Sequence, residues 1–471
     1  MIEKLTVKNV FSFRDLTEFS FLATSERARP GFEHIKWYTV SNRKKLLKAV
    51  FLFGNNGAGK SNFLEAIQLL RLFVLKRRDS KSEAEETLPT VQFKFESKYR
   101  ALPSTISIII HVRKKRYTYT ISWNSKAILL ERLQKQTGIR SDETVFRRTY
   151  DEEKDLVQID FAPKLKWDDD AQEIIRENVI RNTSVVSIYS HKNMYAPELA
   201  DLYDYFDTPY HLIGLEDYHL DLCRMLNAGE RPAFFHDMLI RLLDSVGSNI
   251  RDYKVDRIRR PLNVQFAKFL QTQLTEAEYR EQYPDNMETT RYLRFAHFNN
   301  DAEEDPKDPY VWLTESEESK GTLNMIRLII ILFDTAFSNS IATIDECALS
   351  IHQETFNRII QFYLSISEQS QVFFATQALP ILEMQGFRRD SARFFDKDFQ
   401  TGVSSVESVD LSKFHANKNI YKNYVDHAFG GTPKVPEPEE WARLLGQFRE
   451  EVTHFTKPKE PTIFDDDDLP F

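Results

Sequence analysis

The chain has 471 residues, of which 41% are hydrophobic, so it can bury a large core, and at roughly 150 residues per domain it can form two or three packed units. Its 63 Lys and Arg against 71 Asp and Glu give a net charge of −8, so a nucleic-acid-binding surface would have to be a local patch. Two distant cysteines (Cys223 and Cys347) exclude a disulfide framework, and the absence of an apolar run of about 18 residues or a signal-like start predicts a cytoplasmic protein with no membrane contact.

The first 164 residues alternate between strand patterns and one helix. Residues 2–21 alternate in a strand-like way, and residues 46–53 (LLKAVFLF) predict a buried strand. That strand runs into a glycine-rich loop and then into an apolar helix over residues 62–75. Residues 76–90 are polar and predict an exposed connection. The period-2 runs VQFKFE, TISIIIHV, RYTYTISW and AILLERL then predict an antiparallel meander over residues 91–160.

The rest of the chain divides into three further segments. Residues 165–307 carry helical patterns (AQEIIRENVI, PAFFHDMLIRLLDSV, NVQFAKFLQTQL) and predict a helical insertion or lid. Residues 308–433 return to alternating strands and helices, which predicts the second half of the same α/β head. Residues 434–471 predict a C-terminal helix and an acidic tail (FDDDDLPF), either solvated or acting as a docking peptide.

The strongest motif is the glycine-rich loop between the buried strand and the helix. The sequence GNNGAGKS fits a phosphate-binding loop, because glycines let successive backbone N–H groups converge on phosphate oxygens and the helix start adds its positive dipole end. Lys60 would reach the β- and γ-phosphates and the Ser61 hydroxyl would bind Mg²⁺. We therefore predict that ATP is bound by Gly54, Asn55, Asn56, Gly57, Ala58, Gly59, Lys60, Ser61 and Asn62.

A second motif places two acids after the strand-like IATI. Asp345 at the strand end can hold Mg²⁺, and Glu346 next to it can polarise the attacking water. A third motif, Ser319 and Gly321 in ESKGT, opens the helix before that strand and forms an anion site of its own. In ABC-type ATPases this signature loop meets the γ-phosphate held by the opposite subunit, which predicts a head-to-tail dimer.

Two further positions follow from the same comparison with ABC-type heads. Ser350–His352 stands where such heads keep the loop that lines the dimer seam, although His352 could equally be a surface helix start. The strand QVFFAT ends in Thr376–Gln377, where a Thr-His pair is usual. A glutamine amide donates a hydrogen bond but carries neither a proton to transfer nor a charge, so Gln377 predicts slow hydrolysis.

Three basic clusters could form local anion-binding patches. They are residues 76–78, 113–116 and 251–260 (RDYKVDRIRR). Each is more simply a solvated face, and the last is the best candidate for contact with nucleic acid.

The assembled motifs give the chain a family resemblance over most of residues 1–433. They include VKNVFSFRD, GNNGAGKSNFLEAI, FKFESKYRALPSTISIIIHV, YTYTISW, ESKGT, IDECALSIH, FRRDSARFFDKD and YVDHAFGGTP. The chain resembles the bacterial ATP-binding proteins of the abortive-infection type (AbiLi-like or RloA-like), in the overcoming-lysogenization and RecF/SMC-like branch of ABC ATPases. This implies an α/β ABC-type P-loop ATPase head with a mixed sheet, an antiparallel meander and a helical insertion.

The resemblance also implies a biological role. Such proteins are ATPases that use ATP and Mg²⁺, form homodimers or larger homo-oligomers, and control a separate effector in anti-phage defence. The effector would be an RloB-like, Toprim or HNH nuclease, and the trigger a nucleic acid or a phage protein. The chain departs from the family at Phe11, which replaces an arginine, and at Gln377, which replaces the histidine.

Two other functions stay open from the sequence. A RecF/SMC-like DNA-repair ATPase would carry a long heptad coiled coil or a zinc hook, and residues 165–300 show neither. A self-contained nuclease would need a Toprim domain, for which the stretch after Asp398 is too short. The acidic pair Asp396 and Asp398 is then a structural strand end more readily than a metal site.

Overall fold

The computed structural model describes most of the chain. The described residues are 1–24, 26, 38–41, 44–76, 85–138, 141–168, 170–208, 211–214, 222–226, 232, 234–299, 309–345, 351–409, 420–426, 429–431 and 438–456. Met1–Gly431 forms one compact unit and Thr432–Phe471 a second, which contains helix α13 (Pro438–Thr456). The division of the chain into four segments stays a prediction.

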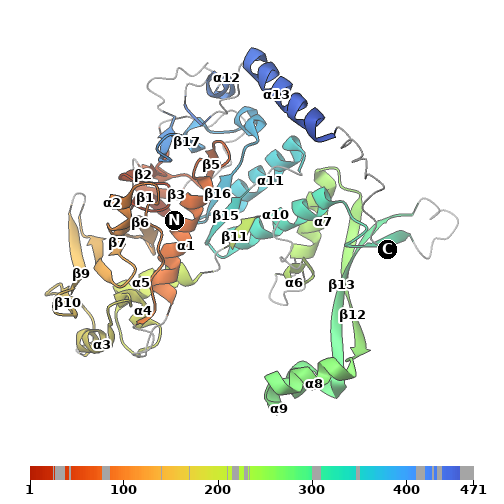
Figure 1. The fold of residues 1–471 in the computed structure, drawn as a ribbon. Helices are drawn as coiled ribbons and strands as arrows, with labels where there is room; N and C mark the ends of the chain where they lie inside the picture. The colour runs from red at the N-terminus through yellow and green to blue at the C-terminus, as the bar shows by residue number, and fades with distance from the viewer. Residues whose placement is uncertain are drawn as a thin grey trace, which may run out of the picture. The chain divides into compact units, whose positions relative to one another are not determined.

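A six-stranded mixed sheet forms the centre of the first unit (Figure 1). Its strand order is β11-β15-β16-β5-β17-β18, and all neighbours are parallel except the last pair. The strands are β5 (Ala49–Phe53), β11 (His211–Gly214), β15 (Ile341–Asp345), β16 (Gln371–Ala375), β17 (Ala392–Lys397) and β18 (Ser404–Ser408). The central strands read as continuous apolar runs because both faces of a parallel sheet are covered.

A seven-stranded antiparallel sheet packs on one side, in the order β10-β9-β8-β7-β6-β1-β2. Its strands are β1 (Ile2–Lys8), β2 (Thr17–Ser20), β6 (Ser104–Val112), β7 (Lys115–Trp123), β8 (Ile128–Gln136), β9 (Asp142–Asp151) and β10 (Leu156–Phe161). The predicted meander is confirmed, except that residues 91–96 (VQFKFE) form no strand. Strands β3 (Tyr38–Ser41) and β4 (Lys44–Leu46), which lie between β2 and β5 in the chain, form a separate two-stranded sheet.

The two faces of the mixed sheet build two apolar cores. In β5, Val50 and Leu52 join the core shared with the antiparallel sheet and helix α1 (Lys60–Leu75), whereas Phe51 joins the core beneath α10 (Lys320–Phe337) and α11 (Gln353–Ile366). Side chains alternate faces along a strand, so one short strand supplies both cores. The predicted α/β class, with a mixed sheet and an antiparallel meander, is confirmed.

Much of the phenylalanine content fills the space around α1. The Phe63 ring lies 4.6 Å from that of Phe19 and 5.5 Å from that of Phe373, measured between ring centroids. Phe395 of β17 stacks on Phe19 at 5.8 Å. Aromatic packing of this kind contributes beyond simple area burial, and here it holds the start of α1 against both sheets.

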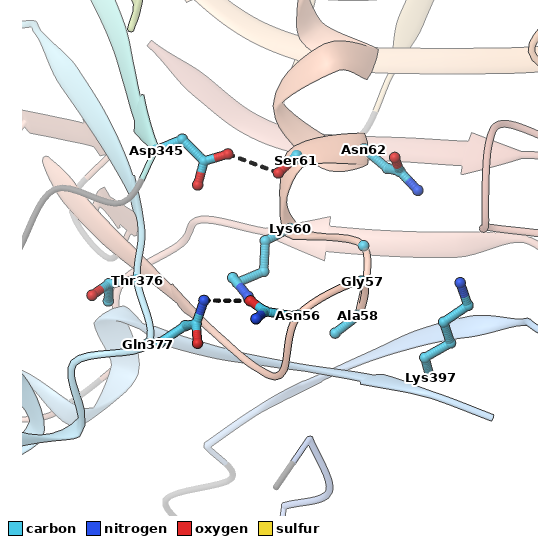
Figure 2. Close-up of a pocket in the computed structure, with 11 residues that line it drawn as sticks. Asn56, Gly57, Ala58, Lys60, Ser61, Asn62, Asp345, Thr376, Gln377 and Lys397 are labelled. Atoms are coloured by element: carbon cyan, nitrogen blue, oxygen red, sulfur yellow. Dashed lines mark hydrogen bonds between the residues drawn. The ribbon is translucent and has the colours of Figure 1, made fainter. Parts of the chain in front are cut away.

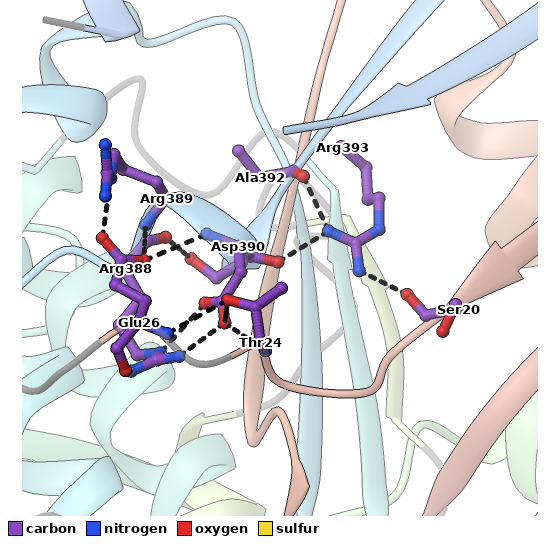
Figure 3. A network of polar contacts seen from close by, with 9 residues as sticks. Ser20, Thr24, Glu26, Arg388, Arg389, Asp390, Ala392 and Arg393 are labelled. Carbon is purple, nitrogen blue, oxygen red and sulfur yellow. Dashed lines mark hydrogen bonds and ion pairs between the residues drawn. The ribbon is translucent and has the colours of Figure 1, made fainter. Parts of the chain in front are cut away.

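A polar network fixes the entry to β17 (Figure 3). The Asp390 carboxylate, 3% exposed, accepts hydrogen bonds from the Thr24 backbone N–H and hydroxyl at 2.8 Å and pairs with Arg388. Arg389 pairs with Glu26 at 2.7 Å, and the buried Arg393 guanidinium donates to the carbonyl oxygens of Asp390 and Ser20. These contacts give the FRRDSAR stretch a structural role, because they anchor β17 to the chain that leaves β2.

Residues 165–307 hold helices, as predicted, but also a long hairpin that the sequence did not predict. Strands β12 (Ile250–Pro261) and β13 (Met287–Phe298) pair along their whole length, and β14 (Tyr310–Thr314) adds a third strand. Helices α8 (Val264–Gln273) and α9 (Glu276–Gln282) connect β12 to β13 (Figure 1). The cluster at residues 251–260 is therefore a strand of this hairpin.

The remaining helices are short or cover the sheets. They are α2 (Ser97–Arg100), α3 (Ala171–Asn178), α4 (Val185–Tyr189), α5 (Pro197–Asp207), α6 (Leu222–Leu226), α7 (Phe235–Ser245) and α12 (Ile420–Val425), with 3-10 turns at Pro284–Asn286, Leu379–Glu383 and Arg389–Ser391. None of the described helices is long and apolar enough to cross a membrane.

Candidate functional site

Four parallel strands end at one edge of the mixed sheet and bring the predicted site together. A cavity of about 290 Å³ opens there, of the kind that α/β sheets form outside the carboxyl ends of their strands. Figure 2 shows its lining, which comes from the loop after β5 and from the ends of β15, β16 and β17. The lining residues are Asn56, Gly57, Ala58, Gly59, Lys60, Ser61, Asn62, Asp345, Thr376, Gln377 and Lys397.

The phosphate loop is shaped by its own lysine. Lys60 is only 8% exposed, and its ammonium group donates hydrogen bonds to the carbonyl oxygens of Gly54 at 2.7 Å and Asn55 at 2.9 Å. The Ala58 backbone N–H donates to the same Asn55 carbonyl oxygen at 3.2 Å, so these contacts close the turn of the loop. A polyanion in the cavity would meet backbone donors, the start of α1 and the Lys60 charge together.

Glycine is required where α1 begins. Gly59 precedes the helix with φ of 112°, and a Cβ there would lie 2.8 Å from the Ser404 hydroxyl oxygen. A chain of hydrogen bonds runs beneath it: the Asn62 amide donates to the Ser12 hydroxyl at 2.6 Å, and the Ser404 hydroxyl donates to the same oxygen at 2.8 Å. Asn62 thus fixes the loop to the β1–β2 turn. The sequence predicted only a role for Asn62 in nucleotide binding, so this structural contact is additional.

The predicted metal ligands meet directly. The Ser61 hydroxyl donates to an Asp345 carboxylate oxygen at 2.7 Å (Figure 2). A hydroxyl and a carboxylate are hard oxygen ligands, and Mg²⁺ bound to a nucleotide takes one or two such protein ligands while phosphates and water fill the rest. The residues present therefore fit Mg²⁺. Desolvation, together with the negative charge of Asp345, raises the pKa of Glu65 one turn further along α1.

Gln377 reaches the loop from the end of β16. Its amide nitrogen donates to the Asn56 side-chain oxygen (Figure 2), so it faces the cavity where the usual histidine would stand. The neighbouring Thr376 side chain is 2% exposed and its hydroxyl accepts from the Ala378 backbone N–H at 3.0 Å. Thr376 shapes the turn after β16, and the contact of Gln377 with a terminal phosphate stays a prediction.

Some predicted residues lie outside the described part of the chain. Glu346, Cys347 and Ser350 are in the stretch 346–350, whose placement is not described, so the catalytic role of Glu346 stays a prediction. His352 follows that stretch and caps α11, with its ring nitrogen accepting from the Glu354 backbone N–H at 3.3 Å. That contact agrees with the simpler interpretation of His352 as a helix start.

The signature residues start α10 and do not line the cavity. Ser319 is exposed and its hydroxyl accepts from the Thr322 backbone N–H at 3.0 Å, which makes it the helix cap; Gly321 follows in the first turn. The preceding Glu318 is ion-paired with His297 near the end of β13. The first turn of α10 is thus fixed to the hairpin, with Ser319 exposed, and the role of Ser319 at a nucleotide stays a prediction.

Lys397 is a cavity residue that the sequence did not reveal. It ends β17, the parallel neighbour of β5, and lies across the loop from Gln377 (Figure 2). The flanking acids point to the other face of the strand: Asp396 lies against Gly430, and Asp398 accepts backbone hydrogen bonds from Gln400 at 2.9 Å and Thr401 at 2.8 Å. Asp398 is therefore built into the turn after β17, whereas Asp396 is a residue of the strand itself. The sequence shows a lysine between the two acids, but only the pairing of β17 with β5 places this lysine beside the phosphate loop.

We expect Lys397→Ala to weaken ADP and ATP to the same extent, by about tenfold, because one charge-assisted hydrogen bond is worth about 1.5–3 kcal/mol. If Gln377 and Asp345 face the γ-phosphate as predicted, a lysine on the opposite side of the loop would meet the inner phosphates that both nucleotides share. Gln377→Ala should weaken ATP alone. Isothermal titration with both nucleotides measures this, with the exposed Lys154→Ala as control. Unchanged ADP affinity in Lys397→Ala would contradict it.

Two of the three basic clusters are engaged internally. In the cluster at residues 113–116, Arg113 pairs with Asp204 at 2.8 Å and Arg116 pairs with Glu3 at 3.1 Å. In the cluster at residues 76–78, Lys76 pairs with Glu86 at 2.7 Å, and residues 77–78 lie outside the described structure. In the hairpin cluster, Arg251 pairs with Asp244 and the Lys254 ammonium lies 4.0 Å from the centre of the Trp312 ring. Arg257 and Arg259, further along the same strand, are exposed.

Comparisons with known proteins point to one sequence family. The family described as "AAA domain, putative AbiEii toxin, Type IV TA system" matches residues 49–382. No curated protein matches the chain. Among solved structures, the SMC head domain from Thermotoga maritima has a TM-score of 0.38 at 12% identity, covering 87% of this chain and 99% of that one. An SMC head bound to the C-terminal winged-helix domain of ScpA has a TM-score of 0.38 at 13% identity, covering 88% and 98%. A Pyrococcus furiosus SMC head with an extended coiled coil has a TM-score of 0.39 at 11% identity, covering 88% and 97%.

Proposed function

The chain belongs to the AAA-domain family named for AbiEii-type toxins of type IV toxin–antitoxin systems, and from that premise we propose that it is the ATPase subunit of an anti-phage defence system. It binds MgATP and holds or releases a separate effector according to its nucleotide state. The observation that carries the proposal is the Ser61–Asp345 contact at 2.7 Å inside a cavity lined by the phosphate loop. That arrangement supports Mg²⁺-dependent nucleotide binding by this chain.

The proposed hydrolysis is slow. Glu346 would polarise the attacking water, as its place after Asp345 suggests. Gln377 would hydrogen-bond the γ-phosphate, but a glutamine amide cannot take up or supply a proton in the transition state. A head that binds ATP well and turns it over slowly spends most of its time in one nucleotide state, which suits a switch better than a motor.

The proposed active species is a homodimer or a larger homo-oligomer. The phosphate loop faces one cavity, whereas Ser319 and Gly321 start α10 outside it. In the proposed assembly, Ser319 of one copy meets the γ-phosphate bound by the other, so ATP holds two heads together. ATP then shifts a population between separate and joined heads, which a trigger can bias.

A separate effector fits the described structure better than a nuclease within the chain. The described residues contain no group of three or more His, Cys, Asp or Glu side chains that could hold a metal ion. Asp398, one member of the acidic pair, is used by a turn. We propose an RloB-like, Toprim or HNH nuclease as the effector, with a nucleic acid or phage protein as the trigger.

A RecF/SMC-like DNA-repair ATPase is the alternative. Such proteins use a long coiled coil between the two halves of the head. The described part of residues 165–307 instead forms short helices and the β12–β13 hairpin. This favours a local sensor or docking element over a coiled-coil arm.

The test of the proposed function is the variant Glu346→Gln. Removing the water-activating carboxylate should trap ATP between two heads, so size-exclusion chromatography with MgATP should show a species of at least twice the monomer mass. The double variant Glu346→Gln/Lys60→Ala serves as control and should stay monomeric. If Glu346→Gln elutes as the monomer with MgATP, the nucleotide-gated dimer is wrong.

A further inference from the structure

The outer half of the β12–β13 hairpin is a free two-stranded ribbon. β14 pairs with β13 only from Arg294 to Phe298, whereas β12 and β13 remain paired out to Pro261 and Met287. Beyond Arg294, none of the described strands pairs with the ribbon. Its outer β12 residues, from Arg257 onward, are exposed.

One face of this ribbon collects three arginines. Arg257 lies directly opposite Arg291 in the strand pairing, and Arg259 lies two residues along from Arg257. Residues directly opposite, and residues two apart on one strand, share a face. All three arginines are exposed, and none of them has a hydrogen bond or ion pair within the described structure. We call Arg257, Arg259 and Arg291 the arginine face.

The charges on the opposite face are engaged. Arg294 forms an ion pair with Asp256, and the Arg260 guanidinium lies 5.9 Å from the centre of the Tyr292 ring with Glu288 directly opposite in the strand pairing. One side of the ribbon thus satisfies its cations within the protein. The arginine face does not, although like charges directly opposite on paired strands destabilise a sheet by up to about 1 kcal/mol. The hairpin gains nothing from this arrangement, so a ligand is the simplest reason for it.

The chemistry of the face selects a polyanion. A guanidinium binds a phosphate through two parallel N–H donors, and Arg257 and Arg259 stand about 6.6 Å apart along their strand. A two-stranded ribbon is also narrow enough to enter the major groove of B-form DNA. We propose that the arginine face of the β12–β13 hairpin binds the phosphate backbone of duplex DNA without sequence preference.

The hairpin also contacts the signature turn at the start of α10. His297, near the end of β13, is ion-paired with Glu318, which directly precedes Ser319. A duplex held by the ribbon therefore acts on the strand that fixes the signature turn. This link rests on the proposed function, because it matters only if Ser319 meets a nucleotide; the DNA site itself does not depend on it.

The experiment measures fluorescence anisotropy of a labelled 30-base-pair duplex of arbitrary sequence against the full chain without nucleotide. We expect a Kd of about 10⁻⁶ to 10⁻⁴ M that weakens steeply with salt. The variant Arg257→Gln/Arg259→Gln/Arg291→Gln should lose at least about tenfold in affinity, and the slope of log K against log salt should fall by about 0.9 for each phosphate contact removed.

A matched control removes the same number of charges from the end of β12 and from the two helices that connect it to β13. Arg260→Gln/Lys268→Gln/Arg280→Gln changes three exposed cations that lie off the arginine face and should leave the affinity within about twofold. Equal losses in both triple variants, no salt-dependent binding by the wild type, or tighter binding of a single strand or a poly-glutamate peptide than of the duplex would overturn the proposal. If the duplex binds but leaves the rate of ATP hydrolysis unchanged, only the link to Ser319 is wrong.

Discussion

Replacing Lys60 by alanine is expected to lower the affinity for MgATP and MgADP by at least about 100-fold, since hydrogen bonds to a charged group contribute about 1.5–3 kcal/mol each and Lys60 would make two or more to phosphate oxygens. No other cation of the described structure replaces it, because Lys397, the second lysine of the cavity lining, ends β17 on the far side of Ala58 (Figure 2). Isothermal titration with both nucleotides measures the loss.

The control separates binding from folding. In the structure Lys60 also donates to the carbonyl oxygens of Gly54 and Asn55, so Lys60→Ala loosens the loop as well as removing the charge. Thermal unfolding without nucleotide shows how large that effect is, and Lys8→Ala, at an exposed position of β1, is the charge-matched comparison. A folded Lys60→Ala protein that still binds MgATP within tenfold of the wild type would refute the assignment of the phosphate loop.

The second large effect concerns two variants that are inactive alone and active together. Ser319→Asp keeps the cap of α10, because aspartate caps helices as well as serine does, but places a negative charge where the partner's γ-phosphate would lie. We expect it to bind MgATP normally and to hydrolyse almost none. Lys60→Ala should be inactive because it binds too little nucleotide.

Mixing the two variants tests whether the site is shared between copies. In a mixed dimer the intact phosphate loop of one copy faces the intact Ser319 of the other, so an equimolar mixture should recover about a quarter of the wild-type rate if the dimer is symmetric and one site suffices. Ser319→Asn, which caps the helix without a charge, should retain more activity than Ser319→Asp. If the mixture stays as inactive as its parts while each variant remains folded, Ser319 does not complete the partner's site.

The phosphate loop and Asp345 are both predictable from the sequence. The loop at residues 54–61 depends on consecutive residues, because a buried strand, clustered glycines and an apolar helix follow one another in the chain. Local sequence is therefore enough to predict its geometry. Asp345 is also predictable, because an acid at the end of an apolar strand lies at the sheet edge where parallel strands end. Both expectations meet in the Ser61–Asp345 contact.

Elements whose pattern depends on distant partners were harder to predict. VQFKFE at residues 91–96 alternates like a strand but forms none. Residues 250–261 mix charged and apolar side chains and have helical patterns on both sides in the chain. The sequence therefore predicts them as part of a helical insertion, whereas the structure shows a strand. Their strand character comes from pairing with residues 287–298, on the far side of two helices, and local propensity cannot show such a partner.

The sequence by itself determined the α/β class, the glycine-rich loop between β5 and α1, and the position of Asp345 at the end of β15, because each depends on residues that are neighbours in the chain. Only the tertiary structure decided which other side chains share the cavity. Lys397 lies there because β17 pairs with β5, and Arg257 faces the same way as Arg291 because of one strand register. Strand order and register are set by the packing of the whole sheet, so no short stretch of sequence contains them.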